Sequence, residues 1–340
     1  KKTIKPKLEF LEKMKKLLSQ ADFEEYEKII QEPLLNSIRC NTLKISPEQL
    51  KKRLEEKGWK VIQPWSSNSR DTIAKPNLKN PSGLREKDYP EVMVIENELQ
   101  PGELGRSIEH QLGYYYIQEL ASMLPPIALA PKPHELILDL CASPGSKTSQ
   151  IASQMENKGT IIANDISIER IKILASNLER CGVTNTILTR DDGIRLCEKL
   201  NLEGLKFDKI LLDAPCSGEG TMRSSPKTCL MWNPNTIKSL SKLQKKLFEK
   251  AFEILKKDGE IVYSTCTHAP EENEEVIDFA LKEFKDQIEI EKINLPVKCR
   301  EGVVKWEDKN YNNELKKSCR IYPQDNNTEG FFITKFKKIK

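Results

Sequence analysis

The chain has 340 residues, a formal net charge of +4 and charged side chains at 31% of its positions. Single hydrophobic cores stop growing at about 250–300 residues, so this length predicts two domains. We find no signal peptide and no apolar run long enough to span a membrane, which argues against a membrane protein and predicts a cytoplasmic one.

The cysteines are expected to be thiols. The chain has 9 cysteines, an odd number without CxxC pairs, and only 3 histidines. This pattern is typical of neither a disulfide framework nor a zinc site, so no metal is expected. Six are expected to be buried or incidental thiols, namely Cys40, Cys181, Cys197, Cys229, Cys299 and Cys319.

The first 35 residues predict a helical segment. Between residues 8 and 31 apolar side chains such as Leu8, Leu11 and Met14 recur at helical spacing, and Pro33 ends the pattern. We expect this segment to serve packing rather than chemistry.

Residues 36–112 predict a small α+β domain. A helix is indicated from the cap residue Ser46 to Gly58. Strand-like runs cover residues 37–45, 59–64 and 91–97, and a Pro/Asn/Ser-rich stretch covers residues 64–90. One helix on an antiparallel sheet is the expected arrangement. A ferredoxin-like or RRM-like module of this kind often binds RNA.

Residues 113–340 predict a larger α/β domain. Residues 101–115 look like a linker into it, and we expect the tyrosines at 114–116 to pack at the seam rather than stack on bases. The domain itself is expected to be a Rossmann-like, doubly wound and mostly parallel sheet.

The stretch ILDLCASPGSKT, residues 137–148, predicts the first strand, loop and helix of that sheet. Its loop has neither the two glycines of a phosphate-binding loop nor the three of a dinucleotide fingerprint. A nucleoside ligand without a pyrophosphate remains, and S-adenosylmethionine is such a ligand.

Further strand ends are expected to face the same crevice. Apolar runs end at Asp165, 20 residues beyond Gly145, and at the adjacent Asp191 and Asp192. An acid about 20 residues beyond the loop glycine is typical of a ribose contact. Either Asp191 or Asp192 can accept a hydrogen bond from an adenine. Two later runs end in Asp213 with Cys216, and in Cys266.

Two thiols at neighbouring strand ends point to methylation of C5 in a pyrimidine. C5 becomes nucleophilic only when a thiolate attacks C6, and loss of the C5 proton later expels the thiol. A carboxylic acid or an ammonium near N3 stabilises the charge on the ring, and Asp213 and Lys147 are the candidates. The base must leave its stack, which costs less in single-stranded or looped RNA.

The motifs ILDLCASPGSKT, LLDAPCSGEGTMR, STCTHAPEENEE and RIYPQDNNTEGFF, in this order, resemble the NOP/Sun family of RNA cytosine-5 methyltransferases. The similarity is to its archaeal tRNA-modifying branch. The segment SIRCNTLK resembles the N-terminal RNA-binding domain of that family. The resemblance implies that Cys266 is the nucleophile and that Cys216 assists release of the product.

The resemblance also implies the cofactor contacts. The methionine part of S-adenosylmethionine would be lined by Cys141, Ala142, Pro144, Gly145 and Lys147. The ribose would be held by Asp165 and Arg170, the adenine by Asp192, and the reacting centre by Asp213. Arg223 and Arg320 are implied as RNA or structural contacts.

The expected function is therefore S-adenosylmethionine-dependent methylation of cytosine C5 in RNA by a monomer, with tRNA as the substrate. The same chemistry on ribosomal RNA is one alternative. A catalytically silent RNA-binding or assembly protein is a second. A methyltransferase for small molecules or proteins is a third, but it has no use for two positioned thiols.

Overall fold

The computed structural model describes residues 6–66, 88–225 and 227–340. Two helices open the described chain, α1 (Leu8–Leu17) and α2 (Gln20–Ile29). The helical segment expected from the sequence is therefore divided into two helices. The break falls at Ser19, whose side chain accepts a hydrogen bond from the Asp22 amide and caps α2.

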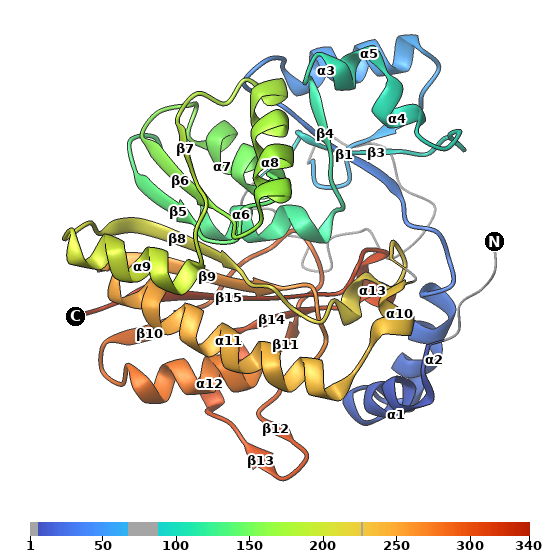
Figure 1. Cartoon of the computed structure of the whole chain (residues 1–340). Coiled ribbons are helices and arrows are strands. Elements are labelled where there is room, and N and C mark those ends of the chain that lie inside the picture. The colour runs from blue at the N-terminus through green and yellow to red at the C-terminus, as the bar shows by residue number, and fades with distance from the viewer. Residues whose placement is uncertain (1–5, 67–87, 226) are drawn as a thin grey trace.

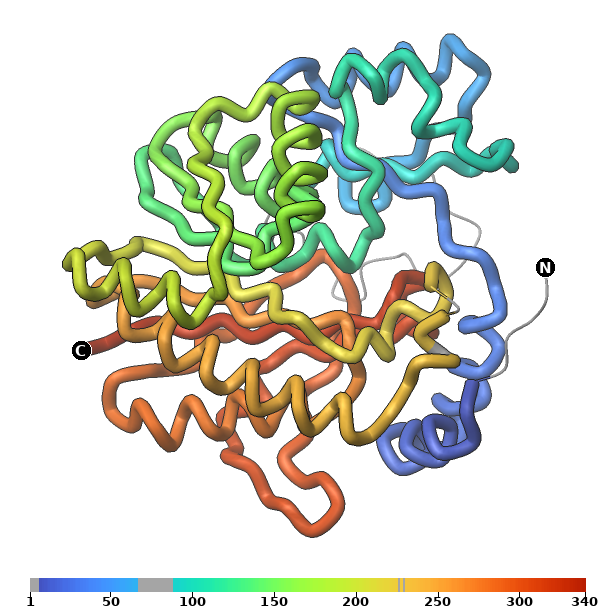
Figure 2. The backbone as a smooth tube through the Cα atoms, viewed as in Figure 1, coloured from blue at the N-terminus to red at the C-terminus, as the bar shows by residue number. Residues whose placement is uncertain are grey.

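These two helices pack on the C-terminal part of the chain. Phe10, Met14 and Phe23 are buried in one apolar cluster with Trp232 and Tyr322. Figure 2 shows the dark-blue helices beside the red segment near α13 (Pro323–Asn326). The N-terminal segment is thus part of the larger unit in space, as its expected packing role requires.

A four-stranded antiparallel sheet follows, with the strand order β2-β3-β1-β4. Its strands are β1 (Asn36–Cys40), β2 (Val61–Ile62), β3 (Val92–Ile95) and β4 (Tyr115–Ile117). One helix, α3 (Pro47–Glu56), begins with a capping box formed by Ser46 and Gln49 and buries Leu50 and Leu54 in the same cluster as Ile38. The arrangement of one helix on an antiparallel sheet matches the sequence prediction (Figure 1).

The end of this sheet lies further along the chain than expected. β4 pairs with β1 although it follows residue 112, where we placed the domain boundary. The stretch 101–115 is no plain linker, because it contains α4 (Glu103–Arg106) and α5 (Ile108–Gln111). Most of the stretch 64–90 lies outside the described residues.

The second sheet has nine strands, in the order β11-β14-β15-β9-β8-β5-β6-β7 with β10 paired to β15. The parallel strands are β5 (Leu136–Asp139), β6 (Thr160–Asn164), β7 (Thr186–Thr189), β8 (Phe207–Asp213) and β9 (Leu255–Thr265). From β5 the chain moves first to one side of the sheet and then, at β8, to the other. This confirms the doubly wound sheet and places its topological switch point between β5 and β8.

Helices cover both faces of this sheet (Figure 1). One cluster joins the strands to α6 (Leu124–Leu129), α7 (Ser146–Gln154) and α8 (Ile168–Cys181). The other joins them to α9 (Gly193–Leu202), α11 (Pro234–Glu253) and α12 (Glu274–Glu283). Ile137 faces the first cluster and its neighbour Leu138 the second, which explains the unbroken apolar run of β5.

The antiparallel part of the sheet comes from the end of the chain. It consists of β10 (Ile288–Glu291), β11 (Arg300–Glu301), β14 (Cys319–Ile321) and β15 (Phe331–Lys338), and a separate hairpin is made of β12 (Lys305–Trp306) and β13 (Lys309–Asn310). The remaining short helices are η2 (Ala121–Met123), η3 (Glu219–Thr221), α10 (Lys227–Met231) and η4 (Asn313–Lys317).

One prediction about the cysteines is wrong. Cys299 and Cys319 form a disulfide with their Cα atoms 5.1 Å apart. Cys319 lies on β14, which pairs with β11 immediately after Cys299. Strand pairing therefore brings together two cysteines that show no recognisable motif in the sequence.

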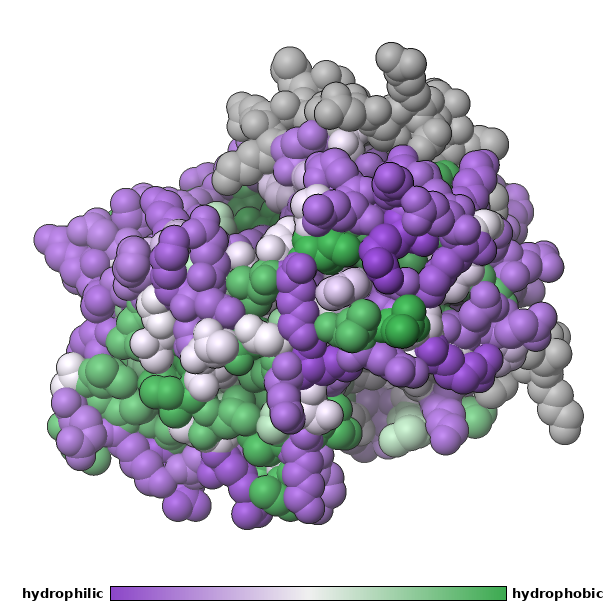
Figure 3. Space-filling model, turned by 90° about the horizontal axis from the view of Figure 1, so that it is seen from above, coloured by the Kyte–Doolittle hydropathy of each residue, from purple (hydrophilic) through white to green (hydrophobic). Residues whose placement is uncertain are grey.

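The surface carries apolar side chains at the other edge of the sheet. Ile187 and Leu188 of β7 are 55% and 36% exposed, and Ile173 of α8 is 52% exposed. Figure 3 shows apolar surface among hydrophilic surface on the face seen from the top of Figure 1. Within the described residues, no helix combines the length and the apolar character needed to cross a membrane.

Candidate active site

The loop after β5 is built around Gly145. Its φ of +101° lies in the left-handed region, and it is the N-cap of α7. A Cβ atom at this position would lie 2.8 Å from Leu174 Cδ1. Glycine therefore lets the loop turn close to α8 and present the amide groups at the start of α7 to the crevice.

The other loop residues occupy different environments. The buried Ala142 donates its amide to Asn164 O at 2.8 Å, whereas Pro144 is exposed and its carbonyl accepts from Asn177 at 2.9 Å. Burial raises the pKa of the Cys141 thiol, so this side chain stays protonated. Cys141 is thus a neutral lining residue.

Asp139, at the end of β5, is a site residue that the sequence analysis did not assign. It is 1% exposed, and its Oδ2 accepts a hydrogen bond from the Thr148 hydroxyl at 2.7 Å. Its Oδ1 is buried and has no hydrogen-bond partner among the described residues. Burial, with a smaller effect of the nearby Asp213, raises its pKa to about 7. In the sequence, the position of Asp139 at the end of an apolar run was the feature that could have identified it.

Asp165 and Arg170 lie together beside the loop, as expected. Asp165 is 3% exposed, and its Oδ2 lies 3.3 Å from Arg170 Nη2. Arg170 Nη2 also donates to the Ser143 carbonyl at 2.7 Å. The pair therefore joins the end of β6 to the loop after β5.

Asp191 and Asp192 are distinguished by their partners. Asp191 forms an ion pair with Lys199 at 2.5 Å. Asp192 caps α9 through one oxygen, Oδ1, which accepts from the Ile194 amide at 3.0 Å and the Arg195 amide at 3.2 Å. Its Oδ2 has no hydrogen-bond partner among the described residues and can accept other hydrogen bonds. This arrangement supports Asp192 as the adenine contact, which stays a prediction.

Lys147 and Asp213 meet across the switch point of the sheet. Lys147 Nζ lies 2.7 Å from Asp213 Oδ2 and donates to Ser122 Oγ at 3.1 Å. Asp213 Oδ1 accepts from Ser264 Oγ at 2.7 Å. Burial alone would lower the pKa of Lys147, but Asp213 outweighs burial and raises it above its usual value. The lysine is therefore a fixed ammonium, 5.3 Å from the ring centre of Phe331.

The two cysteines predicted at the strand ends lie side by side. Cys216 Sγ and Cys266 Sγ are 3.2 Å apart, because β8 and β9 are parallel neighbours with Asp213 opposite Ser264. The hydrogen bond to Cys266, together with burial, raises the pKa of Cys216 well above its usual value. Cys216 therefore keeps its proton in this arrangement.

Gly220 joins the three loops of the site. Its amide donates to the Cys266 carbonyl at 2.9 Å, and its own carbonyl accepts from the Gly330 amide at 2.9 Å. A Cβ atom on Gly220 would lie 2.2 Å from Gly330 O and 2.9 Å from Cys266 O. Only a glycine allows the loops after β8 and β9 and the segment before β15 to approach so closely.

The two arginines implied as RNA or structural contacts are both engaged inside the protein. Arg320 is 2% exposed and forms a buried ion pair with Glu274, which agrees with the structural alternative and not with an RNA contact. Arg223 donates to the carbonyls of Thr328 and Pro33, each at 2.9 Å. It ties the N-terminal segment to the segment before β15.

Trp232 and His268, which lie near the loops of the site, are also structural. Trp232 is 5% exposed and packs in the apolar cluster of α1. His268 is 1% exposed and stacks on Tyr322 with ring centres 5.1 Å apart. Burial lowers the pKa of His268 to about 3, so this histidine is neutral.

The residues around the loop fit S-adenosylmethionine. The unpaired Oδ1 of Asp139 is an acceptor for an ammonium group. Gly145 turns the loop so that the first amides of α7 face the crevice, and Asp165 and Asp192 supply acceptors for a nucleoside at successive strand ends. A charged amino acid portion joined to a nucleoside matches this set of groups.

Two family models match the sequence. One, described as 16S rRNA methyltransferase RsmB/F, matches residues 126–337. The other, the N-terminal domain of 16S rRNA methyltransferase RsmF, matches residues 7–71. Together they cover the larger domain and the N-terminal part of the chain.

Relatives and solved structures agree with these matches. The chain is 42% identical to tRNA (cytosine(49)-C(5))-methyltransferase of Pyrococcus abyssi over 93% of its own length and 92% of the relative. It is 38% identical to ribosomal RNA small subunit methyltransferase F of Psychromonas ingrahamii over 97% of its length, but spans only 63% of that relative.

Two crystal structures from Pyrococcus horikoshii resemble the fold. One is a methyltransferase homolog protein, with a TM-score of 0.76, 34% identity and coverage of 98% of this chain and 99% of that chain. The other is NSun6 with SFG, with a TM-score of 0.74, 28% identity and coverage of 98% of both chains.

Proposed function

Because the chain belongs to the RsmB/F family, we propose that it methylates C5 of cytosine in RNA through Cys266, with tRNA as its substrate. As a member of that family it is an RNA methyltransferase that depends on S-adenosylmethionine. The tRNA proposal rests on the Pyrococcus abyssi relative, which is matched over 92% of its length, against 63% for the ribosomal RNA enzyme of Psychromonas ingrahamii.

The observation that carries the chemistry is the pair of thiols. Two sulfur atoms 3.2 Å apart, beside the Lys147–Asp213 ion pair, are what attack on a pyrimidine ring and its reversal require. When bound, S-adenosylmethionine supplies an electrophilic methyl group on a sulfonium. The cytosine ring must first be made nucleophilic, and this is the task proposed for Cys266.

In the first step, Cys266 gives up its thiol proton to water and its Sγ forms a bond to C6 of the cytosine. The electron pair of the C5–C6 double bond moves to C5, which can then accept the methyl group. Negative charge spreads over the ring toward N3, and the ammonium of Lys147 stabilises it in a partly enclosed site. Asp213 holds Lys147 in place, and its proposed second task is to accept a hydrogen bond from the base.

In the second step, the C5 proton leaves and the bond between C6 and Cys266 breaks. The main cause of the raised pKa of Cys216 is its hydrogen bond to Cys266, which is lost once the Cys266 sulfur is bonded to C6. Cys216 can then lose its own proton to water and take the proton from C5. The electron pair returns to the C5–C6 bond and expels the Cys266 thiolate.

The four-stranded sheet is the proposed RNA-binding module. The lysine side chains of its α3 region are exposed, for example 79% for Lys52 and 71% for Lys60. Such side chains can contact phosphates without reading sequence. The choice of cytosine would then depend on how this module presents the RNA to the thiols.

The experiment that tests this function is transfer of labelled methyl from S-adenosylmethionine to separate tRNA and ribosomal RNA pools. We expect label at C5 of cytosine in tRNA, and loss of at least about 10³-fold in rate for Cys266→Ala. Cys181→Ala, which changes a cysteine that is 1% exposed at the end of α8, is the matched control and should keep activity.

The outcomes separate the alternatives. Label confined to ribosomal RNA would overturn the tRNA substrate and leave the chemistry standing. A protein that binds RNA but labels neither pool would instead be a silent binding protein. Full activity of Cys266→Ala would show that the proposed nucleophile is wrong.

A further inference from the structure

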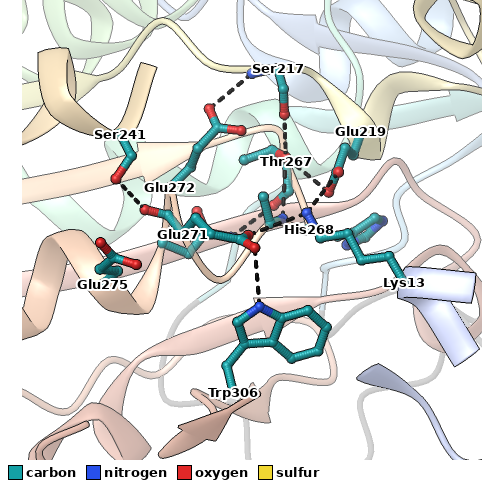
Figure 4. Close-up of polar contacts among 12 residues, drawn as sticks. Lys13, Ser217, Glu219, Ser241, Thr267, His268, Glu271, Glu272, Glu275 and Trp306 are labelled. Atoms are coloured by element: carbon teal, nitrogen blue, oxygen red, sulfur yellow. Dashed lines mark hydrogen bonds and ion pairs between the residues drawn. The ribbon is translucent and has the colours of Figure 1, made fainter. Parts of the chain in front are cut away.

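A buried polar network, drawn in Figure 4, includes the residues that directly follow the two thiols in the chain. Each catalytic cysteine is followed in the chain by a hydroxyl residue, Ser217 after Cys216 and Thr267 after Cys266. The two hydroxyl oxygens are 2.8 Å apart. This hydrogen bond links the backbone segments that carry the two cysteines.

Two carboxylates hold this hydroxyl pair from either side. Glu272 Oε2 accepts from the Ser217 amide at 3.0 Å, and Glu219 Oε2 accepts from Thr267 Oγ1 at 3.3 Å. Both glutamates are 0% exposed. The positions of the thiols therefore depend on how these two buried side chains are fixed.

Glu272 needs no cation to stay in place. Burial raises its pKa to about 7, and its Oε1 has no hydrogen-bond partner among the described residues, so this oxygen can carry a proton. Gln244 donates to its Oε2 at 2.9 Å. Glu272 is thus held by neutral donors.

Glu219 differs because a lysine from the N-terminal helix reaches it. Lys13 of α1 is 9% exposed, and its Nζ lies 3.0 Å from Glu219 Oε1 and 3.3 Å from Glu271 Oε2. Trp232 Nε1 donates to Glu219 Oε1 at 2.7 Å. Figure 4 shows Lys13 entering the network from the side opposite Ser241.

A buried carboxylate that loses its cation is strongly destabilised, because its charge is neither solvated nor paired. Without Lys13, Glu219 would have to take up a proton or turn away from its present position. Either response changes the hydrogen bond that Thr267 makes to Glu219. The disturbance would reach Cys266 through one peptide bond and Cys216 through the hydroxyl pair.

We propose that Lys13 is a positioning residue for the thiol pair, acting through Glu219, Thr267 and Ser217. Lys13 and Glu219 are separated by 206 positions in the sequence, so helix α1 completes an active site that much later segments form. This inference rests on the proposed roles of Cys266 and Cys216. It assigns to the N-terminal helices a function beyond packing.

The first test is steady-state kinetics of the full chain with Lys13→Met. A displacement of the thiols by a fraction of an ångström should lower kcat by about 10- to 100-fold. The KM for S-adenosylmethionine should stay unchanged, because the cofactor loop lies outside the network. Lys13→Arg, which keeps the charge, should restore most of kcat.

The matched control is Lys16→Met on the same helix. The Lys16 side chain is 65% exposed, and its nearest carboxylate oxygen, on Glu307, lies 3.7 Å away. This variant should keep kcat. A second variant, Lys13→Met combined with Glu219→Gln, removes both buried charges and should recover part of the loss, which independent structural effects would not do.

The second test measures the thiol pair without RNA. Dibromobimane becomes fluorescent when it bridges two neighbouring thiols, so the wild-type chain should be labelled and Cys216→Ala should not. Dibromobimane should bridge the two thiols more slowly in Lys13→Met than in Lys16→Met. Should Lys13→Met fail to fold, Thr267→Val, which removes the hydroxyl between Glu219 and Ser217, takes its place with the same expected result.

The two proposals fail in different ways. If RNA is methylated and Lys13→Met equals Lys16→Met in both kcat and bridging, the positioning role is wrong and the proposed function stands. If bridging depends on Lys13 but no RNA is methylated, the proposed function is wrong and the positioning role stands.

Discussion

Asp139 keeps one carboxylate oxygen unpaired at the base of the cofactor loop, within the part of the chain that the structure describes. Its pKa is raised by burial to about 7. In an unfolded chain an aspartate titrates near about 3.9. Between these values the folded protein holds a proton that the unfolded chain has released. Raising the pH through this window therefore lowers the free energy of unfolding.

Asp139→Asn should remove this pH dependence. Between pH 5 and pH 8 the wild-type chain should lose about 1–4 kcal/mol of unfolding free energy relative to the variant, and the loss should be complete above pH 7. Urea denaturation at a series of pH values measures it. Glu198→Gln, at an exposed residue of α9, serves as the control. Parallel curves for Asp139→Asn and wild type would contradict a raised pKa at Asp139.

At the scale of elements, the site depends on three loops that meet at Gly220. β8 and β9 end side by side, so the loops that follow them must pass within hydrogen-bond distance of each other and of the segment before β15. A side chain at Gly220 has no space to occupy, because the surrounding atoms are backbone. The thiol pair therefore depends on a contact that neither strand makes alone.

Gly220→Ala should separate the loops. We expect a loss of about 1–3 kcal/mol of stability from overpacking, together with a large fall in methyl transfer. Gly105→Ala is the control, because the nearest atom to a Cβ there is Ile117 Cδ1 at 4.0 Å. Thermal unfolding and methyl transfer measured on both variants test this. Equal behaviour of the two alanine variants would mean that the loops tolerate the extra carbon.

At the scale of the whole molecule, Arg39 joins the four-stranded sheet to helix α7, which packs on the nine-stranded sheet. It is 1% exposed on β1, and it donates to Ser146 O at 2.7 Å and to Ser149 Oγ at 2.8 Å, both in the first turns of α7. The same helix begins at Gly145 and carries Lys147. The proposed RNA-binding module is thereby attached directly to the helix that forms the cofactor loop.

Arg39→Met should loosen this attachment. Losing the hydrogen bonds from the guanidinium to Ser146 O and Ser149 Oγ should cost about 2–3 kcal/mol of stability, and the KM for S-adenosylmethionine should rise. Lys52→Met, on the exposed face of the same domain, should change neither quantity. Calorimetry and cofactor titration give the comparison, and an unchanged KM in Arg39→Met would show that the contact is not needed for the loop.

Short-range patterns in the sequence predicted the strands, the caps and the meeting of the strand ends. Cys216, Cys266, Asp213 and Lys147 each lie at the end of an apolar run or in the loop after it, and the parallel sheet brings them together. At Ser46, for example, the local signal for a helix start was confirmed by the capping box of α3.

What the sequence could not predict depends on partners far away in the chain. Nothing near Arg320 shows that its charge is buried against Glu274, so the sequence left its role open between an RNA and a structural contact. The disulfide of Cys299 and Cys319 follows from the pairing of β11 with β14. Lys13 looked like any lysine of an amphipathic helix, because the carboxylate that it neutralises lies on another element.

The covalent step is tested most directly by incubating Cys216→Ala with tRNA and S-adenosylmethionine and separating the products on a denaturing gel. Without Cys216 to assist release, the bond between Cys266 and C6 should persist, and a protein–RNA adduct should accumulate. The double variant Cys216→Ala/Cys266→Ala should give none. An adduct that survives the loss of Cys266, or full turnover by Cys216→Ala without any adduct, would contradict the mechanism.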